Sequence, residues 1–248
     1  MASTLVAFHK AAVSATLLPL TVVADPHVSY AGTDLTVPSL NQVVAALIFG
    51  NAPTRAQLQS PSMRRLIQED IGSMIATEVT ATADIALHDK RADPLVLEPS
   101  EKLNVYTIHT LDGWGLVWLA DGPIVPAHGD IRTIRCTTGH TTAADAWENV
   151  ALTLTQTLPA GRYQIVGMGA CGTNLLAARL VLIGESWRPG CPAGADIYGC
   201  VPYQFRYGAF GVLGEFEFDQ PPSVDLLGTG VTAAEEIYLD IIQVRAGR

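Results

Sequence analysis

The feature that most constrains the fold is a series of short apolar runs, separated by turn residues, from about residue 76 onwards. Turns are indicated by Asp112-Gly113, Asp121-Gly122-Pro123 and Pro159-Ala160-Gly161, since Gly and Pro supply the backbone angles that tight turns need. Several runs alternate with period two, which places Phe216 and Phe218 on one face of a strand. The expected strands are 78–88, 101–111, 115–120, 130–138, 149–158, 162–170, 175–184, 211–219 and 237–245.

Eight or nine short strands at this spacing are typical of an antiparallel β-sandwich or jelly roll. We therefore assign residues 76–248 to such a domain. The sequence contains no internal repeat and no low-complexity segment.

Residues 1–75 follow a different pattern, and we expect them to form an N-terminal arm. Segment 16–25 predicts a strand. Segment 39–52 predicts a helix, because its apolar residues recur at helical spacing. A Ser suited to the helix N-cap precedes them, and a Gly suited to the helix C-terminus follows them. Segment 60–75 begins with Ser-Pro, which is typical of a helix start. The expected fold is thus mainly β, with two short α-helices in the arm.

The apolar stretch 11–24 has some features of a signal peptide, because it follows Lys10 and ends in small residues. Pro19 and the short length argue against a membrane span, which needs about 20 apolar residues. We interpret the stretch as an extended segment of the arm.

Residues 162–172, RYQIVGMGACG, end in a G-x-G-x-x-G pattern that is typical of dinucleotide-binding folds. Such a site requires a glycine turn, a helix and a second parallel strand that ends in an acidic residue. Only twelve residues, 173–184, precede the acidic residue Glu185, and a parallel crossover needs a dozen before its second strand begins. We therefore reject dinucleotide binding and interpret 162–170 and 175–184 as an antiparallel pair of strands.

Two glycines of this stretch, Gly167 and Gly169, lie two residues apart and share one face of the expected strand. Two missing side chains on one face indicate the close approach of another element, or a bulge. We predict that replacing either glycine with Val impairs folding or assembly and leaves no cofactor affinity to lose.

The charge of the chain limits its partners. With 24 acidic and 15 basic residues the net charge is −9, and charged residues make up 16% of the chain against a usual value of about 25%. Such low charge in a chain with 48% hydrophobic residues indicates either that copies of the chain cover part of its surface or that the chain forms a compact domain rich in Ala and Thr. Residues 1–54 contain one Lys and no Arg, which argues against binding nucleic acid through a basic arm.

The sequence predicts no catalytic residue, cofactor or metal site. The six His are dispersed and form no HExxH motif, and Gly184-Glu185-Ser186-Trp187 lacks the pattern of a nucleophile elbow. The four Cys include no C-x-x-C pair. Cys191 and Cys200 flank a Pro- and Gly-containing loop, and they either form a disulfide or remain free thiols.

Two aromatic groups have a functional interpretation beside a structural one. Trp114 and Trp118 share a face if 114–118 is extended, and they form either a sugar platform or part of the core between sheets. Segment 198–210 is rich in Tyr and Phe, which are enriched in interface cores, and it is either a subunit contact or a simple ordered loop. The candidate contact residues are Tyr198, Tyr203, Phe205, Tyr207 and Phe210.

Segments 158–170 (LPAGRYQIVGMGA), 178–191 (ARLVLIGESWRPGC) and 237–245 (IYLDIIQVR) resemble the strands of jelly-roll capsid proteins from icosahedral, non-tailed bacterial viruses. The resemblance covers about residues 76–245 and rests on the texture and order of the strands. It implies a structural protein of the virion that assembles with copies of itself, alongside other virion proteins, and has no catalytic residues.

The absence of a basic arm suits a shell that a membrane or another protein layer separates from the genome. The alternative to a capsid subunit is a carbohydrate- or receptor-binding β-sandwich, such as a surface or spike module in a secreted or extracellular setting. The sequence leaves open the symmetry of an assembly and whether the chain builds one jelly roll or two.

Overall fold

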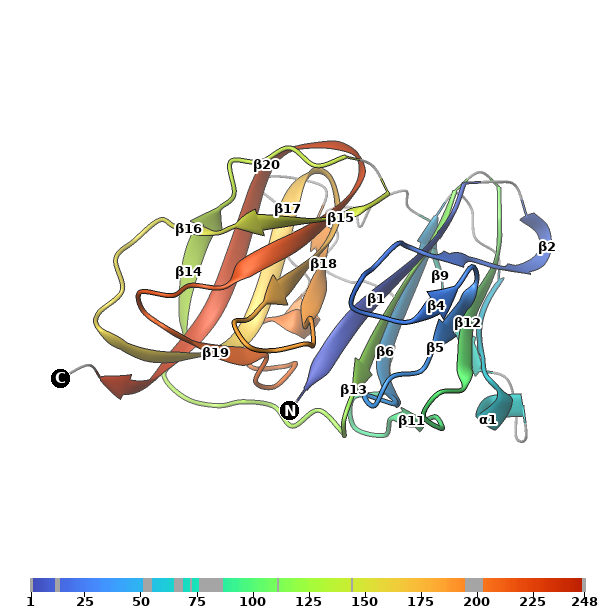
Figure 1. Cartoon of the computed structure of the whole chain (residues 1–248), viewed down its shortest axis with the longest axis horizontal. Coiled ribbons are helices and arrows are strands. Elements are labelled where there is room, and N and C mark those ends of the chain that lie inside the picture. The colour runs from blue at the N-terminus through green and yellow to red at the C-terminus, as the bar shows by residue number, and fades with distance from the viewer. Residues whose placement is uncertain are drawn as a thin grey trace. The chain divides into compact units, whose positions relative to one another are not determined.

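The computed structural model describes residues 2–11, 14–50, 55–64, 69–71, 73–75, 87–110, 112–143, 145–194 and 203–246 (Figure 1). The chain forms two compact units. The N-terminal unit consists of Ser3–Glu78 and Asp84–Pro123, and the C-terminal unit is built mainly from Ile124–Arg248. Both units consist of predominantly antiparallel sheets, so the prediction of a mainly β, antiparallel fold is confirmed. Among the described residues, no helix is long and apolar enough to cross a membrane.

The first sheet of the N-terminal unit has the strand order β10-β6-β13-β1-β3, and β9 and β11 also pair with β6. All neighbours are antiparallel except β6 and β9. The strands are β1 (Ser3–Lys10), β3 (Thr21–Val22), β6 (Gln42–Gly50), β9 (Ser73–Ile75), β10 (His88–Asp89), β11 (Leu95–Val96) and β13 (Gly113–Ala120).

The second sheet of this unit has the order β4-β5-β12-β7-β8, and β2 also pairs with β12. Its strands are β2 (Ser14–Pro19), β4 (Tyr30–Ala31), β5 (Asp34–Thr36), β7 (Arg55–Gln59), β8 (Glu69–Ile71) and β12 (Lys102–His109). Along β12 every second side chain is buried, beginning with Leu103. One apolar cluster joins side chains of both sheets, for example Phe8 of β1 and Val105 of β12, so the two sheets pack as a sandwich.

The prediction of an N-terminal arm with two helices is wrong. Residues 39–52 contain strand β6, in which every residue from Val43 to Gly50 is buried. A continuous apolar run satisfies helical spacing as well as it satisfies a strand that is covered on both faces, and the Val and Ile residues favour the strand. In the second expected helix only α1 (Pro61–Arg64) is helical, and strands β8 and β9 follow it; residues 65–68 and 72 lie outside the described part.

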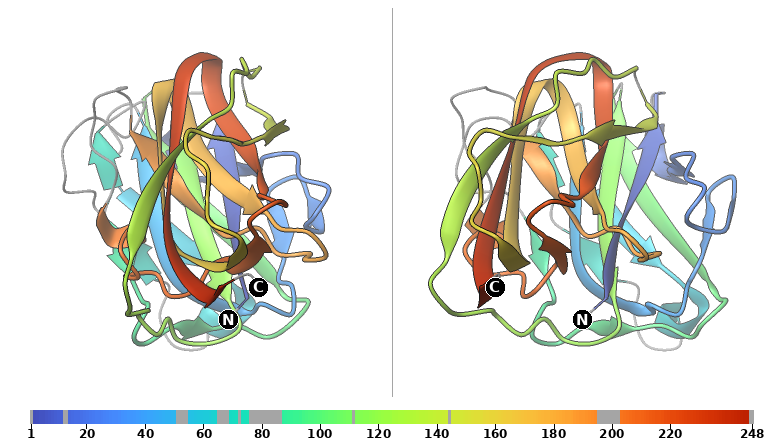
Figure 2. Two further views of the ribbon diagram at one scale, coloured as in Figure 1. Left: turned by 90° about the vertical axis from the view of Figure 1, so that its left-hand side faces the viewer. Right: turned by 60° about the vertical axis from the view of Figure 1, so that its left-hand side comes forward.

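The C-terminal unit is formed by one strongly curved sheet with the order β16-β14-β20-β17-β18, in which β15 also pairs with β20 and β19 with β17. Two strands, β17 and β20, extend through the whole unit, and Figure 2 shows the red ribbon of β20 turning over at the top. The elements are β14 (Arg132–Thr137), β15 (Trp147–Ala151), β16 (Thr153–Leu154), β17 (Gly161–Val181), β18 (Gly190–Gly194), η1 (Tyr203–Phe205), β19 (Gly214–Glu217) and β20 (Ser223–Ala246).

The curvature arises because β17 and β20 each contribute two halves to the sheet. Their pairing runs from Gly161 opposite Ala246 to Val181 opposite Ser223. Strand β18 pairs with the first half of β17 at Ala170 and with the second half at Ala178. The sheet therefore curls round to become nearly closed and barrel-like.

The expected hairpin of 162–170 and 175–184 is not formed, because β17 continues through both segments and pairs with β20 along its length. Register shifts between Cys171 and Ala177 mark bulges, and Asn174 adopts a left-handed φ of 59°. Bulges bend a strand without reversing it. The G-x-G-x-x-G pattern thus lies inside a bent strand, and no helix follows it within the described residues.

Candidate interaction surface

The aromatic segment predicted as a subunit contact divides into exposed and buried residues. Tyr203 and Tyr207 are 62% and 52% exposed, and their rings stack with centroids 6.4 Å apart. Phe205 and Phe210 are buried and stack on each other with centroids 4.8 Å apart. Tyr198 lies outside the described residues. The contact candidate is thereby reduced to the two exposed tyrosines, while the two phenylalanines are buried in the C-terminal unit.

Successive turns give this loop its shape. Backbone hydrogen bonds connect Arg206 N to Tyr203 O and Ala209 N to Arg206 O, each at 3.0 Å. Tyr207 adopts a left-handed φ of 53°, which is uncommon for a residue other than Gly, Asn or Asp. Gly208 donates to Val166 O at 2.7 Å and accepts from Ala127 N at 2.9 Å. The backbone is therefore bonded to two neighbouring segments of the same unit.

A buried ion pair next to Tyr207 holds the loop in place. Arg206 donates from Nε to Asp240 Oδ2 and from Nη2 to Asp240 Oδ1, both at 2.7 Å. The same carboxylate accepts from Thr133 Oγ1 at 2.6 Å and from the backbone N of Tyr207 at 2.8 Å. Bidentate Arg–carboxylate bonds are strong and directional, so the position of Tyr207 is coupled to β20, which carries Asp240.

The ionisation of this pair follows from two opposed effects. Burial alone raises the pKa of the Asp240 carboxyl, but the hydrogen bonds from Arg206, Thr133 and Tyr207 outweigh burial and hold the pKa below its usual value. Burial likewise opposes the charge on Arg206, and the bonds to Asp240 raise its pKa above the ordinary value. Both groups are therefore charged at neutral pH.

Gly167 provides the space for this arrangement. It pairs with Asp240 across the two long strands. A Cβ at Gly167 would overlap Asp240 Oδ2 and lie 2.8 Å from Tyr207 N, closer than side-chain atoms ordinarily approach. Gly169 is also buried, and it lies opposite Tyr238 in the same pair of strands. The element that approaches this strand face at Gly167 is thus the loop that carries Tyr207, which we call the aromatic loop, together with the Arg206–Asp240 ion pair.

Sequence reasoning found the tyrosines but missed Arg206 and Asp240, which hold them. One signal was present: Asp240 interrupts the apolar run of IYLDIIQV, and an acid on a buried strand normally has a cationic partner. The partner could not be read from the sequence, because Arg206 lies 34 residues away in the chain.

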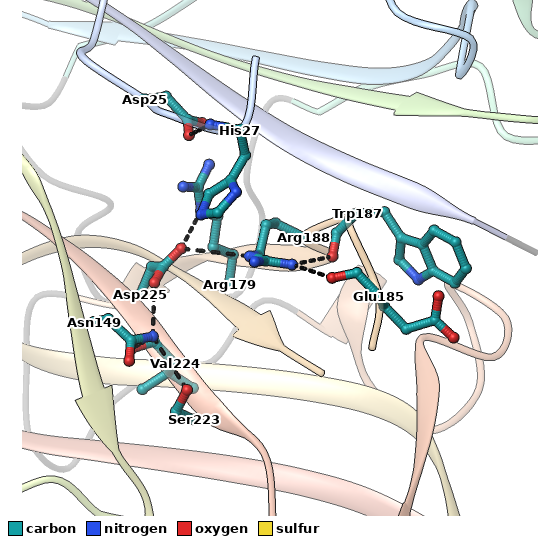
Figure 3. A network of polar contacts seen from close by, with 10 residues as sticks. All are labelled: Asp25, His27, Asn149, Arg179, Glu185, Trp187, Arg188, Ser223, Val224 and Asp225. Carbon is teal, nitrogen blue, oxygen red and sulfur yellow. Dashed lines mark hydrogen bonds and ion pairs between the residues drawn. The ribbon is translucent and has the colours of Figure 1, made fainter. Parts of the chain in front are cut away.

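A second buried ion pair lies elsewhere in the C-terminal unit, and Figure 3 shows its surroundings. Arg179 Nε donates to Asp225 Oδ2 at 2.8 Å, and Asn149 Nδ2 donates to Asp225 Oδ1 at 2.9 Å. The Arg179 guanidinium also lies 4.1 Å from the ring centroid of Trp147. Arg188 donates from Nη1 to the backbone oxygen of Trp187 at 3.0 Å. These contacts connect β15, β17 and β20, so the network stabilises the curved sheet.

The two tryptophans considered as a sugar platform, Trp114 and Trp118, are both buried in β13, so they offer no exposed platform for a sugar. Trp114 stacks on the ring of His9 with centroids 3.8 Å apart, and its Nε1 donates to Asp112 Oδ2 at 3.2 Å. His9 Nε2 lies 2.5 Å from Asp112 Oδ1. This cluster joins the end of β1 to the start of β13.

The cysteines of the described part are buried, and Cys191 is a free thiol. Cys200, its suggested disulfide partner, lies outside the described residues. Burial raises the pKa of the Cys136 thiol to about 12 and raises that of Cys191 as well, so neither is a reactive thiolate at neutral pH. Among the residues that the structure describes, no three His, Cys, Asp or Glu side chains are grouped to hold a metal ion.

A cleft of about 560 Å³ lies beside β14 and β20 in the C-terminal unit. Its apolar walls include Ile134, Tyr163 and Ile241, which are themselves buried. On its rim, Arg132 Nη2 and Asp130 Oδ2 form an exposed ion pair at 2.9 Å. Exposed pairs of this kind contribute little to stability.

No protein-family model and no curated protein matches the chain. Among solved structures it is similar to a xanthan lyase from Paenibacillus, with 12% sequence identity, 92% coverage of this chain and a TM-score of 0.21. The chain spans 25% of the length of the lyase chain. A likeness at this level carries no argument about function.

Proposed function

We propose that the protein is a structural subunit that assembles with copies of itself into a shell, and that this shell is a viral capsid. The observation that carries the proposal is the combination of two compact, mainly antiparallel β units in one chain with a charged fraction of only 16%. A subunit in a sealed shell faces other subunits over much of its surface. It therefore needs rigid units and less charge than a solitary soluble protein.

The rigidity of the C-terminal unit supports this proposal. Strands β17 and β20 are bonded to each other along their length, and β18 pairs with both halves of β17. Two buried ion pairs, Arg179 with Asp225 and Arg206 with Asp240, fix side chains on these strands. A stiff unit loses little conformational freedom when it binds a neighbour.

Within this proposal, we assign the fold of the C-terminal unit to the jelly-roll class. The segments that resemble jelly-roll capsid proteins fall on β17, on the approach to β18, and on β20, which form the frame of the C-terminal sheet. The net charge of −9 and the absence of a basic arm make this chain unsuited to direct contact with the genome. Other virion components, such as a membrane or an inner protein layer, would lie between the shell and the genome.

Sedimentation velocity and negative-stain electron microscopy of the purified full chain test the proposal. We expect large symmetric particles or their ring-shaped precursors, whose share rises with protein concentration. A protein that remains monomeric from micromolar to near-millimolar concentration, at low and at high salt, would contradict the proposal.

A second candidate, a carbohydrate- or receptor-binding surface module, is favoured by the exposed stacking of Tyr203 on Tyr207. Tyrosine combines an apolar ring face with a polar hydroxyl, so it suits a ligand that has both kinds of surface. Saturable glycan binding by a monomeric protein, lost in a Tyr203→Ala/Tyr207→Ala variant, would favour this candidate over a shell subunit.

A further inference from the structure

We propose that copies of this chain meet at a surface formed by Tyr203, Tyr207, Val125 and Pro126, which we call the tyrosine surface. The inference rests on the proposed self-assembly and names the place where it occurs. All four residues are exposed, and Val125 is 70% exposed. An apolar and aromatic patch on a rigid support is typical of an interaction site.

The two segments form one continuous surface because their backbones are bonded. Ala127 N donates to Gly208 O at 2.9 Å, and a Cβ at Gly208 would overlap the Ala127 carbonyl oxygen. Segment 125–127 therefore lies directly against the residue that follows Tyr207. The apolar side chains of Val125 and Pro126 therefore extend the exposed apolar area of the two tyrosines.

The tyrosine surface is ordered before any partner arrives. The Arg206–Asp240 pair holds Tyr207 through the hydrogen bond from Tyr207 N to Asp240 Oδ2, and the guanidinium of Arg206 lies 4.7 Å from the ring centroid of Tyr207. Backbone strain that the surroundings enforce is concentrated at functional sites. A surface that is already ordered avoids much of the entropy that binding otherwise costs.

The distribution of charge supports a second copy as the partner in the proposed self-assembly. Copies with a net charge of −9 repel one another, so contact between them is favoured where acidic residues are absent. Residues 122–127 and 203–214 contain no Asp or Glu, and their one basic residue, Arg206, is buried and neutralised by Asp240. An uncharged aromatic patch suits contact with an identical patch across a two-fold axis.

The test compares the wild-type chain with a Tyr203→Ala/Tyr207→Ala variant and with Phe218→Ala, which removes a 41% exposed aromatic residue elsewhere in the same unit. We expect the tyrosine variant to self-associate roughly 30-fold more weakly or worse, as the loss of interface hot spots implies. Phe218→Ala should assemble as the wild type does. All three proteins should melt at similar temperatures, because the altered side chains are exposed.

A Tyr203→Phe/Tyr207→Phe variant provides the second measurement. It keeps the rings, so its self-association should stay within a few-fold of wild type. If the wild type assembles and the alanine variant assembles equally well, the tyrosine surface is not the contact, although the proposed shell function stands. If the wild type does not assemble under any condition, the proposed function fails and this inference fails with it.

Discussion

Gly167→Ala is the most direct perturbation of the contact between the aromatic loop and its sheet. The added Cβ would overlap Asp240 Oδ2, the atom that accepts from both Arg206 Nε and Tyr207 N. The carboxylate must therefore move, and both hydrogen bonds lengthen or break. The perturbation is the addition of a single methyl group, but it acts on a buried charge.

The magnitude follows from two contributions. Overpacking a well-packed interior costs about 1–3 kcal/mol, and separating a buried ion pair costs about 3–5 kcal/mol because the remaining charge stays desolvated. Since the carboxylate can shift partly, we expect a loss of roughly 3–5 kcal/mol in the free energy of unfolding, a large share of the ~5–15 kcal/mol that domains possess. For a unit of this size, the melting temperature should fall by about 10 °C or more.

Calorimetry and urea titration followed by circular dichroism measure this loss. The matched control is Gly230→Ala in β20, where a Cβ meets its nearest atom, Asn174 Nδ2, at an ordinary 3.4 Å. There the substitution should be neutral or slightly stabilising, because Ala restricts the unfolded chain. Gly167→Ala and Asp240→Asn disturb the same ion pair, so their effects should not add. A Gly167→Ala melting temperature within 2 °C of wild type, or full additivity with Asp240→Asn, would refute the reasoning.

Three further predictions concern charge, thiols and the loop. The pKa of the Asp240 carboxyl is lower in the folded protein than its unfolded value of 3.8. The ionised carboxylate therefore stabilises the fold above pH 3.8, and this contribution is lost as the pH falls below that value. Asp240→Asn should accordingly flatten the acid limb of a plot of melting temperature against pH. Cys136 and Cys191, whose pKa values are raised by burial, should react with a thiol reagent at pH 8 only after unfolding. Gly208→Ala, at a φ of 82° and against the Ala127 carbonyl, should lower the free energy of unfolding by about 2–4 kcal/mol in urea titrations.

Local patterning was sufficient to predict several elements of this fold. Alternating residues such as those of β12, and turn residues such as Asp112-Gly113, predicted strands that the structure contains. The spacing between Gly172 and Glu185 was too short for a crossover helix, and the structure places the glycines inside β17. These inferences succeeded because strand alternation, turn chemistry and chain length are properties of neighbouring residues.

The candidate surface was only partly visible in the sequence. Its tyrosines were visible as an aromatic-rich segment, but the sequence could not tell Tyr203, which is exposed, from Phe205, which is buried. That distinction depends on which side of the loop faces the sheet. The direction of the loop is set by the Arg206–Asp240 pair, whose members are distant in the chain.

The sequence by itself determined the β class, the turns and the absence of a dinucleotide-binding crossover. Only the tertiary structure decided that residues 42–50 form a strand instead of a helix and that 161–181 is one bent strand instead of a hairpin. The physical reason is the same in both cases. An apolar run adopts whichever conformation satisfies its backbone hydrogen bonds and covers its side chains, and both requirements are met by strands that are distant in sequence.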